Sequence, residues 1–282
     1  MIERALAQAL EQARGSEAPP ILNQALRYAV FPGGARIRPR LCLVVARACE
    51  PEPPPLAAAA AAAIELLHCA SLVHDDLPCF DDAAVRRGRP SVHRAYGERI
   101  AVLVGDALIV LALQTLACAR PAARLSRTLG IIGRAVAGPC GIVAGQAWEC
   151  ESEIDLASYQ RAKTGALFAA AAAAGACAAG ADDAGWFTLG ERLGEAYQIA
   201  DDIRDVLGDS GDIGKPTGRD RVLGRPNAVH RLGLQSAIER LEVLVAASLD
   251  AVPDCIGAAE LKTHIRAEAH RLLPRALARP AA

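Results

Sequence analysis

Two long runs of small apolar residues constrain the fold of this chain more than any other feature of its sequence. Leu56–His74 reads LAAAAAAAIELLHCASLVH, and Ala166–Ala181 reads ALFAAAAAAGACAAGA. Alanine is the strongest helix former, and its small side chain lets neighbouring helices approach closely. Hydrophobic residues make up 52% of the chain but aromatic residues only 4%, and no segment alternates apolar and polar residues as a strand would. The sequence therefore predicts an all-α fold in which both runs are buried helices.

Apolar periodicity predicts further helices elsewhere in the chain. They are Ile2–Arg14, Ile21–Val30, Arg38–Glu50, Ile100–Cys118, Leu125–Ala137, Leu189–Leu207 and a pair after Leu234. Gly15–Pro20 and Pro51–Pro55 separate helices, because proline cannot continue one, but both are too short to link domains. We therefore expect a single domain over residues 1–282. The polar, glycine-rich segment Gly208–Asn227 predicts a surface loop that could close over a ligand.

Charge and cysteine content narrow the partners and the compartment. The formal net charge is −1, so no overall basic field favours nucleic acid. The nine cysteines contain no CxxC pair, and the N-terminal stretch MIERALAQALEQARG is charged and amphipathic, unlike a secretion signal. Ala166–Ala181 is shorter than the roughly 20 residues that span a bilayer. These features predict a cytoplasmic protein with reduced thiols, no membrane span and no nucleic-acid partner.

A cluster of aspartates follows the first apolar run, in LVHDDLPCFDDAAVRRG. Asp75 and Asp76 end the run, and Asp81 lies six residues after Asp75. On a regular helix these two residues would lie about 120° apart, so only a departure from helix near Pro78 would bring them together. A lone pair of aspartates more often marks a charged, solvated helix end. A second cluster changes that interpretation.

The second cluster lies in EAYQIADDIRDVLGD, where Asp201, Asp202 and Asp205 again follow an apolar helical run. Asp201 and Asp205 are one turn apart on the same helix face. Two such clusters facing one cavity would repel each other unless a cation bound between them. Mg²⁺ is commonly held by a few carboxylates together with substrate phosphates. The two clusters therefore predict a magnesium site and a phosphorylated ligand.

Three basic segments agree with this prediction. They contain Arg36, Arg38 and Arg40 in GGARIRPR; Arg86, Arg87 and Arg89 in RRGR; and Lys163 and Lys215 further along the chain. Arginine makes forked hydrogen bonds to phosphate oxygens, whereas lysine contributes a point charge. Each segment alone would be read as a solvated surface patch. Together with the two acidic clusters they predict a pocket for two diphosphates.

In this order, the segments GGARIRP, LLHCASLVHDDLPCFDDAAVRRGRPSVH, GIVAGQAWE, KTGALF, YQIADDIRD, IGKPTGRD and RPNAV form a specific combination. The chain resembles the trans-isoprenyl diphosphate synthases, and among them the bacterial geranylgeranyl diphosphate synthases of carotenoid and bacteriochlorophyll pathways. The resemblance implies the isoprenoid synthase fold, a single-domain helical bundle around a deep central cavity. It also implies a homodimer that condenses isopentenyl diphosphate with an allylic diphosphate, with three Mg²⁺ ions as cofactor.

The resemblance also assigns roles to individual residues. The metal ligands would be Asp75, Asp81 and Asp201, together with Asp76 and Asp202, and with Asp205 in support. The allylic diphosphate would contact Arg86, Lys163, Thr164, Gln198 and Lys215. Isopentenyl diphosphate would contact Arg38, His68 and Arg87, and Arg225 would also bind substrate. The residues with direct roles in catalysis would be Asp75, Asp81, Arg86, Lys163, Asp201 and Lys215.

Two positions depart from the pattern of the family. Most relatives have lysine at the positions of Ala35 and Arg225, and the first of these lysines contacts isopentenyl diphosphate. The change at Arg225 keeps the charge, whereas the change at Ala35 loses it. We expect Arg36, Arg38 or a water molecule to compensate.

The length of the product depends on the residues that precede Asp75. Ala70 lies about 7.5 Å before Asp75 along a helix, where a growing hydrocarbon tail first needs room. Relatives that stop at fifteen carbons often have a bulky aromatic there. Ala70 and Ser71 therefore favour the twenty-carbon geranylgeranyl diphosphate, unless Ala70 is small merely because helices pack closely.

Four alternatives remain open on the sequence alone. The chain could be a farnesyl diphosphate synthase with a shorter product. A terpene cyclase would not need Arg38, His68 and Arg87 for a second diphosphate, and a head-to-head prenyl synthase has differently spaced motifs. A catalytically silent partner subunit is disfavoured because both aspartate clusters are intact.

Overall fold

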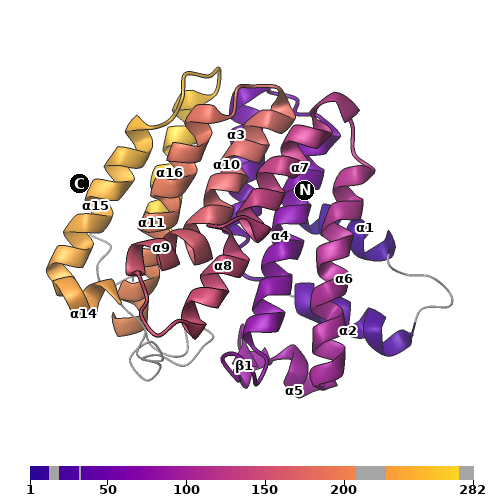
Figure 1. Cartoon of the computed structure of the whole chain (residues 1–282). Coiled ribbons are helices and arrows are strands. Elements are labelled where there is room, and N and C mark those ends of the chain that lie inside the picture. Colours follow the sequence, from indigo (N-terminus) through magenta and orange to yellow (C-terminus); the bar gives the residue numbers. More distant parts are fainter. Residues whose placement is uncertain (13–18, 32, 208–226, 273–282) are drawn as a thin grey trace.

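The computed structural model describes residues 1–12, 19–31, 33–207 and 227–272 of the chain, and it is almost entirely helical (Figure 1). The α-helices are α1 (Ile2–Gln12), α2 (Pro20–Val30), α3 (Ile37–Cys49), α4 (Pro55–Asp75), α5 (Val92–Tyr96), α6 (Glu98–Ala117), α7 (Ala122–Ala137), α8 (Ile142–Ala147), α9 (Leu156–Gln160), α10 (Ala166–Ala179), α11 (Ala184–Leu207), α14 (Ala228–Leu232), α15 (Leu234–Asp250) and α16 (Ala258–Leu272). The prediction of an all-α fold is confirmed, and every predicted helix is present with its ends shifted by a few residues.

The remaining elements are short, and the sequence patterns did not predict them. A 3₁₀ turn, η1 (Trp148–Cys150), follows α8, and a π-helical turn, η2 (Arg161–Gly165), joins α9 to α10. β1 (Val85–Arg86) and β2 (Arg89–Pro90) form a minimal antiparallel hairpin. Both residues of its turn, Arg87 and Gly88, have positive φ angles of 53° and 76°. Such turns match the twist of a hairpin, and glycine adopts this conformation without strain.

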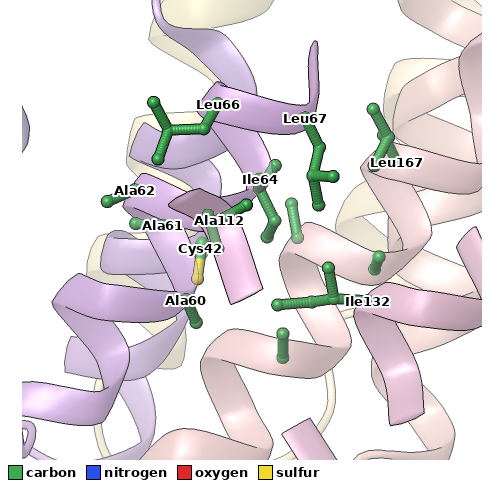
Figure 2. Close-up of a cluster of buried hydrophobic side chains, with 14 of the residues drawn as sticks. Cys42, Ala60, Ala61, Ala62, Ile64, Leu66, Leu67, Ala112, Ile132 and Leu167 are labelled. Atoms are coloured by element: carbon green, nitrogen blue, oxygen red, sulfur yellow. The ribbon is translucent and has the colours of Figure 1, made fainter. Parts of the chain in front are cut away.

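The two alanine-rich helices, α4 and α10, form the centre of the bundle. α4 packs against α3, α6 and α10, while α10 also contacts α7 and α11. Small side chains permit these close contacts: a Cβ atom added at Gly175 of α10 would lie 2.3 Å from the carbonyl oxygen of Cys42 in α3. Figure 2 shows the buried cluster between them, where Ile64 and Leu66 of α4 are fully buried. Each such residue contributes roughly 1.5–3 kcal/mol of transfer free energy.

Four helical stretches of the described residues are long and apolar enough to cross a membrane by length and composition. The apolar helical stretch is longer than the predicted Ala166–Ala181. Because α9, η2 and α10 are continuous, it runs over Ala157–Ala179 and is long enough to span a bilayer. In that stretch 89% of the most apolar window is buried inside the bundle, but in the stretch of α6 only 39% is. Packing within the chain therefore accounts for the apolar character of α10 and leaves an apolar face of α6 exposed.

The C-terminal ends of α4 and α11 carry the two aspartate clusters. α10 packs against both helices, and Figure 1 shows both ends at the same end of the bundle, at the bottom of the view. The two aspartate clusters therefore lie at the same end of the bundle (Figure 1).

Candidate active site

The chain leaves helical geometry directly after Asp75, as the sequence predicted. Asp75 is the last residue of α4, and the backbone N–H of Asp81 donates to the carbonyl of Asp75 at 2.9 Å. A second bond, from the N–H of Ala83 to the carbonyl of Asp76, closes the same turn at 3.1 Å. A helix would have separated Asp75 and Asp81 by more than a turn, so this loop is what places them side by side.

The hairpin after this turn holds Arg86 against Asp76. Arg86 Nη2 lies 2.5 Å and Nε 3.0 Å from Asp76 Oδ1, in a forked arrangement. Burial raises the pKa of Asp76 by more than the hydrogen bond and charge of Arg86 lower it. Arg89 points elsewhere: it donates to the carbonyls of Tyr28 and Phe31 and covers the Tyr28 ring. In the segment RRGR, Arg86 and Arg87 therefore face the site, whereas Arg89 anchors the hairpin to α2.

Lys163 approaches the first cluster from the π-helical turn. Its Nζ lies 2.6 Å from Glu149 Oε1 and 3.6 Å from Asp75 Oδ2. Gln146 on α8 donates to Asp75 Oδ1 at 3.0 Å. Single π-helical turns are frequent at functional sites, because they re-aim one side chain. Gln146 and Glu149 belong to the motif GIVAGQAWE, but the sequence did not predict a role for either residue.

Glycine makes this approach possible. A Cβ atom at Gly145 would lie 2.5 Å from the Lys163 backbone, so α8 reaches the π-helical turn only because residue 145 has no side chain. The segment GQAWE is therefore built to hold Lys163.

The second cluster belongs to a chain of hydrogen bonds across α11. Thr164 Oγ1 donates to Gln198 Oε1 at 2.7 Å, and Gln198 Nε2 donates to Asp202 Oδ1 at 2.9 Å. Asp202 is buried, and its Oδ2 accepts the backbone N–H of Ala228 at 2.7 Å, which ties α14 to α11. Asp201, one residue earlier, is partly exposed and accepts from Arg204 at 3.0 Å. The structure thus gives Asp202 a role in holding the site together, while Asp201 remains accessible to a ligand.

The three residues predicted to bind isopentenyl diphosphate lie near one another. Arg38 Nη1 is 3.5 Å from His68 Nε2, and the guanidinium carbon of Arg38 lies 4.7 Å from the centroid of the Phe168 ring. Burial, followed by the positive charges of Arg38 and Arg87, holds the pKa of His68 well below its usual range. A neutral His68 that accepts from Arg38 at Nε2 has its proton on Nδ1.

Two donors of this group are available to a ligand. His68 Nδ1 and Arg38 Nε are buried and have no hydrogen-bond partner within the described part of the chain. Buried donors are normally paired, and leaving one unpaired costs free energy. An anion between Arg38, His68 and Arg87 would satisfy both.

Arg36 does not belong to this group. Its Nη1 donates to Glu65, its Nε to Glu3 and its Nη2 to the carbonyl of Val30. The expectation that Arg36 could compensate for the missing lysine at Ala35 was therefore wrong. Arg36 has a left-handed backbone (φ 53°) and turns into the protein, which the sequence did not predict.

Two cavities adjoin these residues. A cleft of about 340 Å³ is lined by Asp76, Arg86 and Arg87 together with residues of α2 and the hairpin. A second, apolar cavity lies between α3, α11, α15 and α16 and is lined by Ala196, Phe168 and Tyr197 among others. Neither is lined by Ala70 or Ser71.

Ala70 and Ser71 lie on α4, five and four residues before Asp75. Ala70 is 1% exposed, and Ser71 Oγ donates to the carbonyl of His68 at 2.9 Å. Deeper along the same helix, Figure 2 shows Leu66 and Leu67 in the buried cluster with Ala112, Ile132 and Leu167 of the neighbouring helices. This apolar wall excludes water from the region behind Asp75.

Part of the predicted site falls outside the described residues. These predictions concern Lys215, Arg225 and the loop of residues 208–226. Asn227, the last residue of the predicted loop, is described, and its side chain caps α14 by accepting the N–H of Val229 at 2.9 Å.

The described residues contain no group of three His, Cys, Asp or Glu side chains already close enough to hold a metal ion. The residues nevertheless fit Mg²⁺, because Asp75, Asp81 and Asp201 offer hard carboxylate oxygens from two helix ends. Mg²⁺ usually takes only one or two carboxylates and completes its shell with waters and substrate phosphates. The ion would therefore bind together with a phosphorylated ligand.

Comparison with known proteins agrees with this geometry. The polyprenyl synthetase family model matches residues 19–255. The geranylgeranyl diphosphate synthase of Cereibacter sphaeroides is 51% identical over 97% of this chain and 96% of its own length. That of Rhodobacter capsulatus is 48% identical over 96% and 95%.

A solved structure gives the same result for the fold. The geranyltransferase of Helicobacter pylori, complexed with magnesium and isoprenyl diphosphate, matches with a TM-score of 0.81 at 27% identity, over 96% of each chain. The sequence motifs, the helical bundle and the two aspartate clusters thus agree with the family match: the chain belongs to the polyprenyl synthetase family.

Proposed function

We propose that this chain is a geranylgeranyl diphosphate synthase, a trans-prenyltransferase that joins isopentenyl diphosphate to an allylic diphosphate. One observation carries the proposal: two separate groups of hydrogen-bond donors suited to phosphate adjoin the same aspartate-bearing end of the bundle. Arg86 and Lys163 lie at Asp76 and Asp75, while Arg38 and His68 form the other group. Two diphosphates need two such groups. The close relatives from Cereibacter and Rhodobacter carry the same name.

In the proposed reaction the chain's residues position two substrates and stabilise a departing diphosphate. Mg²⁺, which we propose binds as three ions at Asp75, Asp81 and Asp201, would supply positive charge to the allylic diphosphate. Lys163 and Arg86 donate to the same diphosphate, and Thr164 on η2 and Gln198 on α11 fix its position. Charge placed before the bond breaks needs no reorganisation in the transition state.

The carbon–carbon bond forms after the allylic C1–O bond ionises. Arg38, His68 and Arg87 hold isopentenyl diphosphate so that its double bond attacks the allylic cation. The resulting cation loses a proton, for which the departed diphosphate is the base, and a new allylic diphosphate results. Water would capture the cation, so the apolar wall of Ala70, Leu67 and their neighbours protects it. The remaining predicted ligands, Lys215 and Arg225, complete the proposed site.

The exposed apolar face of α6 supports a homodimer. Val102, Leu103, Val110 and Leu113 are between 42% and 52% exposed along this helix. Apolar side chains exposed on one helix face are costly in water, and a second copy of the chain would cover them. We further propose one polyprenyl synthetase domain over residues 1–282, in the cytoplasm, acting on diphosphates without a nucleic-acid partner.

The test is a product assay. The purified chain is incubated with Mg²⁺, labelled isopentenyl diphosphate and dimethylallyl, geranyl or farnesyl diphosphate in turn, and the dephosphorylated products are separated by chromatography. We expect a twenty-carbon alcohol from each primer. A fifteen-carbon end product would make the chain a farnesyl diphosphate synthase, cyclic products would make it a terpene cyclase, and no product would indicate a silent subunit.

A further inference from the structure

Glu65 is a buried carboxylate to which the reaction as described gives no role. It lies on α4, one turn before His68, and is 2% exposed. Its Oε1 accepts a hydrogen bond from Arg36 Nη1 at 2.5 Å and lies 3.7 Å from Arg87 Nη2. A buried carboxylate is retained at such a position only when it is paired, because desolvation of the charge is costly. Glu65 therefore joins a structural arginine to one that faces the site.

Arg36 is committed entirely to the protein. It uses Nε, Nη1 and Nη2 for Glu3, Glu65 and the carbonyl of Val30. Burial alone would lower the pKa of Arg36, but the hydrogen bonds to Glu3 and Glu65 and the charge of Glu65 outweigh burial and raise it. Arg36 therefore neutralises Glu65 without reaching a ligand.

Arg87 is the partner that faces the site. It occupies the left-handed turn of the hairpin, and its Nε would lie 3.1 Å from a Cβ atom at Gly34, so its side chain passes closely over that backbone. At 3.7 Å its contact with Glu65 is an ion pair and not a short hydrogen bond. Such a contact orients the guanidinium while leaving its N–H groups for another acceptor.

We propose that Glu65 is a positioning residue for isopentenyl diphosphate: it orients Arg87, while Arg36 cancels enough of its charge to leave Arg87 attractive to an anion. The inference rests on the proposed function. The orientation of Arg87 matters more in this chain because Ala35 stands where the resemblance predicts a lysine. Without that lysine, only Arg38, His68 and Arg87 of the predicted residues bind isopentenyl diphosphate.

The test separates the two substrates. Glu65→Gln should raise the KM for isopentenyl diphosphate about tenfold, because Arg87 loses a charged partner. The kcat and the KM for the allylic diphosphate should stay within about twofold, since Arg86 and Lys163 have other partners. Glu65→Asp keeps the charge but has a side chain shorter by one methylene. Its KM for isopentenyl diphosphate should lie between those of Glu65→Gln and the wild type. Equal increases in both KM values would assign Glu65 a structural role only.

A second pair of variants tests the charge argument. Arg36→Met should raise the KM for isopentenyl diphosphate further than Glu65→Gln does, because the uncompensated Glu65 then attracts Arg87 onto itself. In Arg36→Met/Glu65→Gln the KM should return to the value of Glu65→Gln alone. Additive effects would contradict this coupling. The matched control is Glu3→Gln, which removes the other carboxylate of Arg36 far from Arg87 and should leave both KM values unchanged.

The outcomes keep this inference apart from the proposed function. If the wild-type chain does not use isopentenyl diphosphate, the proposed function fails. If the wild type condenses the two substrates but Glu65→Gln retains the wild-type KM, only the positioning role fails. If Glu65→Gln does not fold, the double variant has no unpaired charge and decides the question by its KM.

Discussion

The two ends of the candidate site differ in how far the protein completes them. At the end of α4, Asp75 is 9% exposed and is held by Gln146 and Lys163, and Asp76 is held by Arg86. At the end of α11, Asp201 is 31% exposed and pairs with Arg204 of its own helix. Groups that are fixed before the substrate binds need not reorganise during the reaction. The comparison indicates a preorganised side at α4 and a side at α11 that ligand and metal complete.

The largest effects should come from removing one aspartate at each end. Asp75→Ala and Asp201→Ala should each lower kcat by about 10³-fold or more, because each removes charge stabilisation used mainly in the transition state. Asp75→Ala should also lower the free energy of unfolding, by about 1–2 kcal/mol and by more than Asp201→Ala does, since it removes the buried acceptor of Gln146 and the ion pair with Lys163. Steady-state kinetics and urea unfolding measure the two quantities.

The control is Asp250→Ala, an exposed aspartate at the end of α15. It should behave as wild type in both measurements. Near-normal turnover of the wild type in EDTA would contradict the metal-dependent mechanism, and equal destabilisation by Asp75→Ala and Asp201→Ala would remove the distinction between the two ends.

The next effect concerns the residues one and a half turns before each cluster. Ala70→Tyr should shift the main product from twenty to fifteen carbons with chemistry retained, because the ring would block the path of the tail behind Asp75. Ala196→Tyr is the matched control on α11, five residues before Asp201. Its ring would enter the apolar cavity that Ala196 lines, which Ala70 does not line, so product length should not change.

Chromatography of the products distinguishes these outcomes. If Ala70→Tyr still makes the twenty-carbon product, the tail does not pass Ala70. The floor of the cavity would then be set by other residues, such as those of α6.

The sequence could predict the preorganised side only in part. The break near Pro78 was predicted, because proline beyond the first turn of a helix removes a hydrogen bond and clashes with the preceding turn, and this break places Asp75 beside Asp81. The inward turn of Arg36 could not be predicted, since it depends on Glu3 and Glu65, which lie 33 and 29 residues away. The same holds for the contact of Glu149 with Lys163, which requires a π-helical turn with no local signature.

A gain of binding should follow from placing a lysine at Ala35, just before α3, where the resemblance predicts a lysine in relatives. Ala35 is exposed just before α3, and Arg36 turns away from the site. Ala35→Lys should therefore tighten binding of isopentenyl diphosphate by roughly 1–3 kcal/mol, as expected for a new charged donor to phosphate. Calorimetry with isopentenyl diphosphate measures it, and Ala35→Met controls for chain length without charge. Unchanged affinity would mean that Arg38 already satisfies the diphosphate.

The smallest expected effect is the loss of unfolding free energy at low pH that His68 causes. The pKa of His68 lies well below its usual range because of burial and then the charges of Arg38 and Arg87, whereas in the unfolded chain it is about 6.5. The folded state thus favours the neutral ring, and the unfolded state takes up a proton first as the pH falls. The contribution of His68 to stability is therefore complete above pH 6.5 and is lost below it.

His68→Gln should remove this loss, because glutamine does not titrate and still offers an N–H donor. Between pH 7.5 and 5.5, the wild type should lose about 1 kcal/mol more of its unfolding free energy than His68→Gln does. Urea unfolding at the two pH values measures the difference. His230→Gln, on the exposed side of α14, should lose as much as the wild type. If His68→Gln and the wild type lost equal stability, His68 would already be solvated and not held neutral by Arg38 and Arg87, and the α4 side would be less preorganised than its contacts indicate.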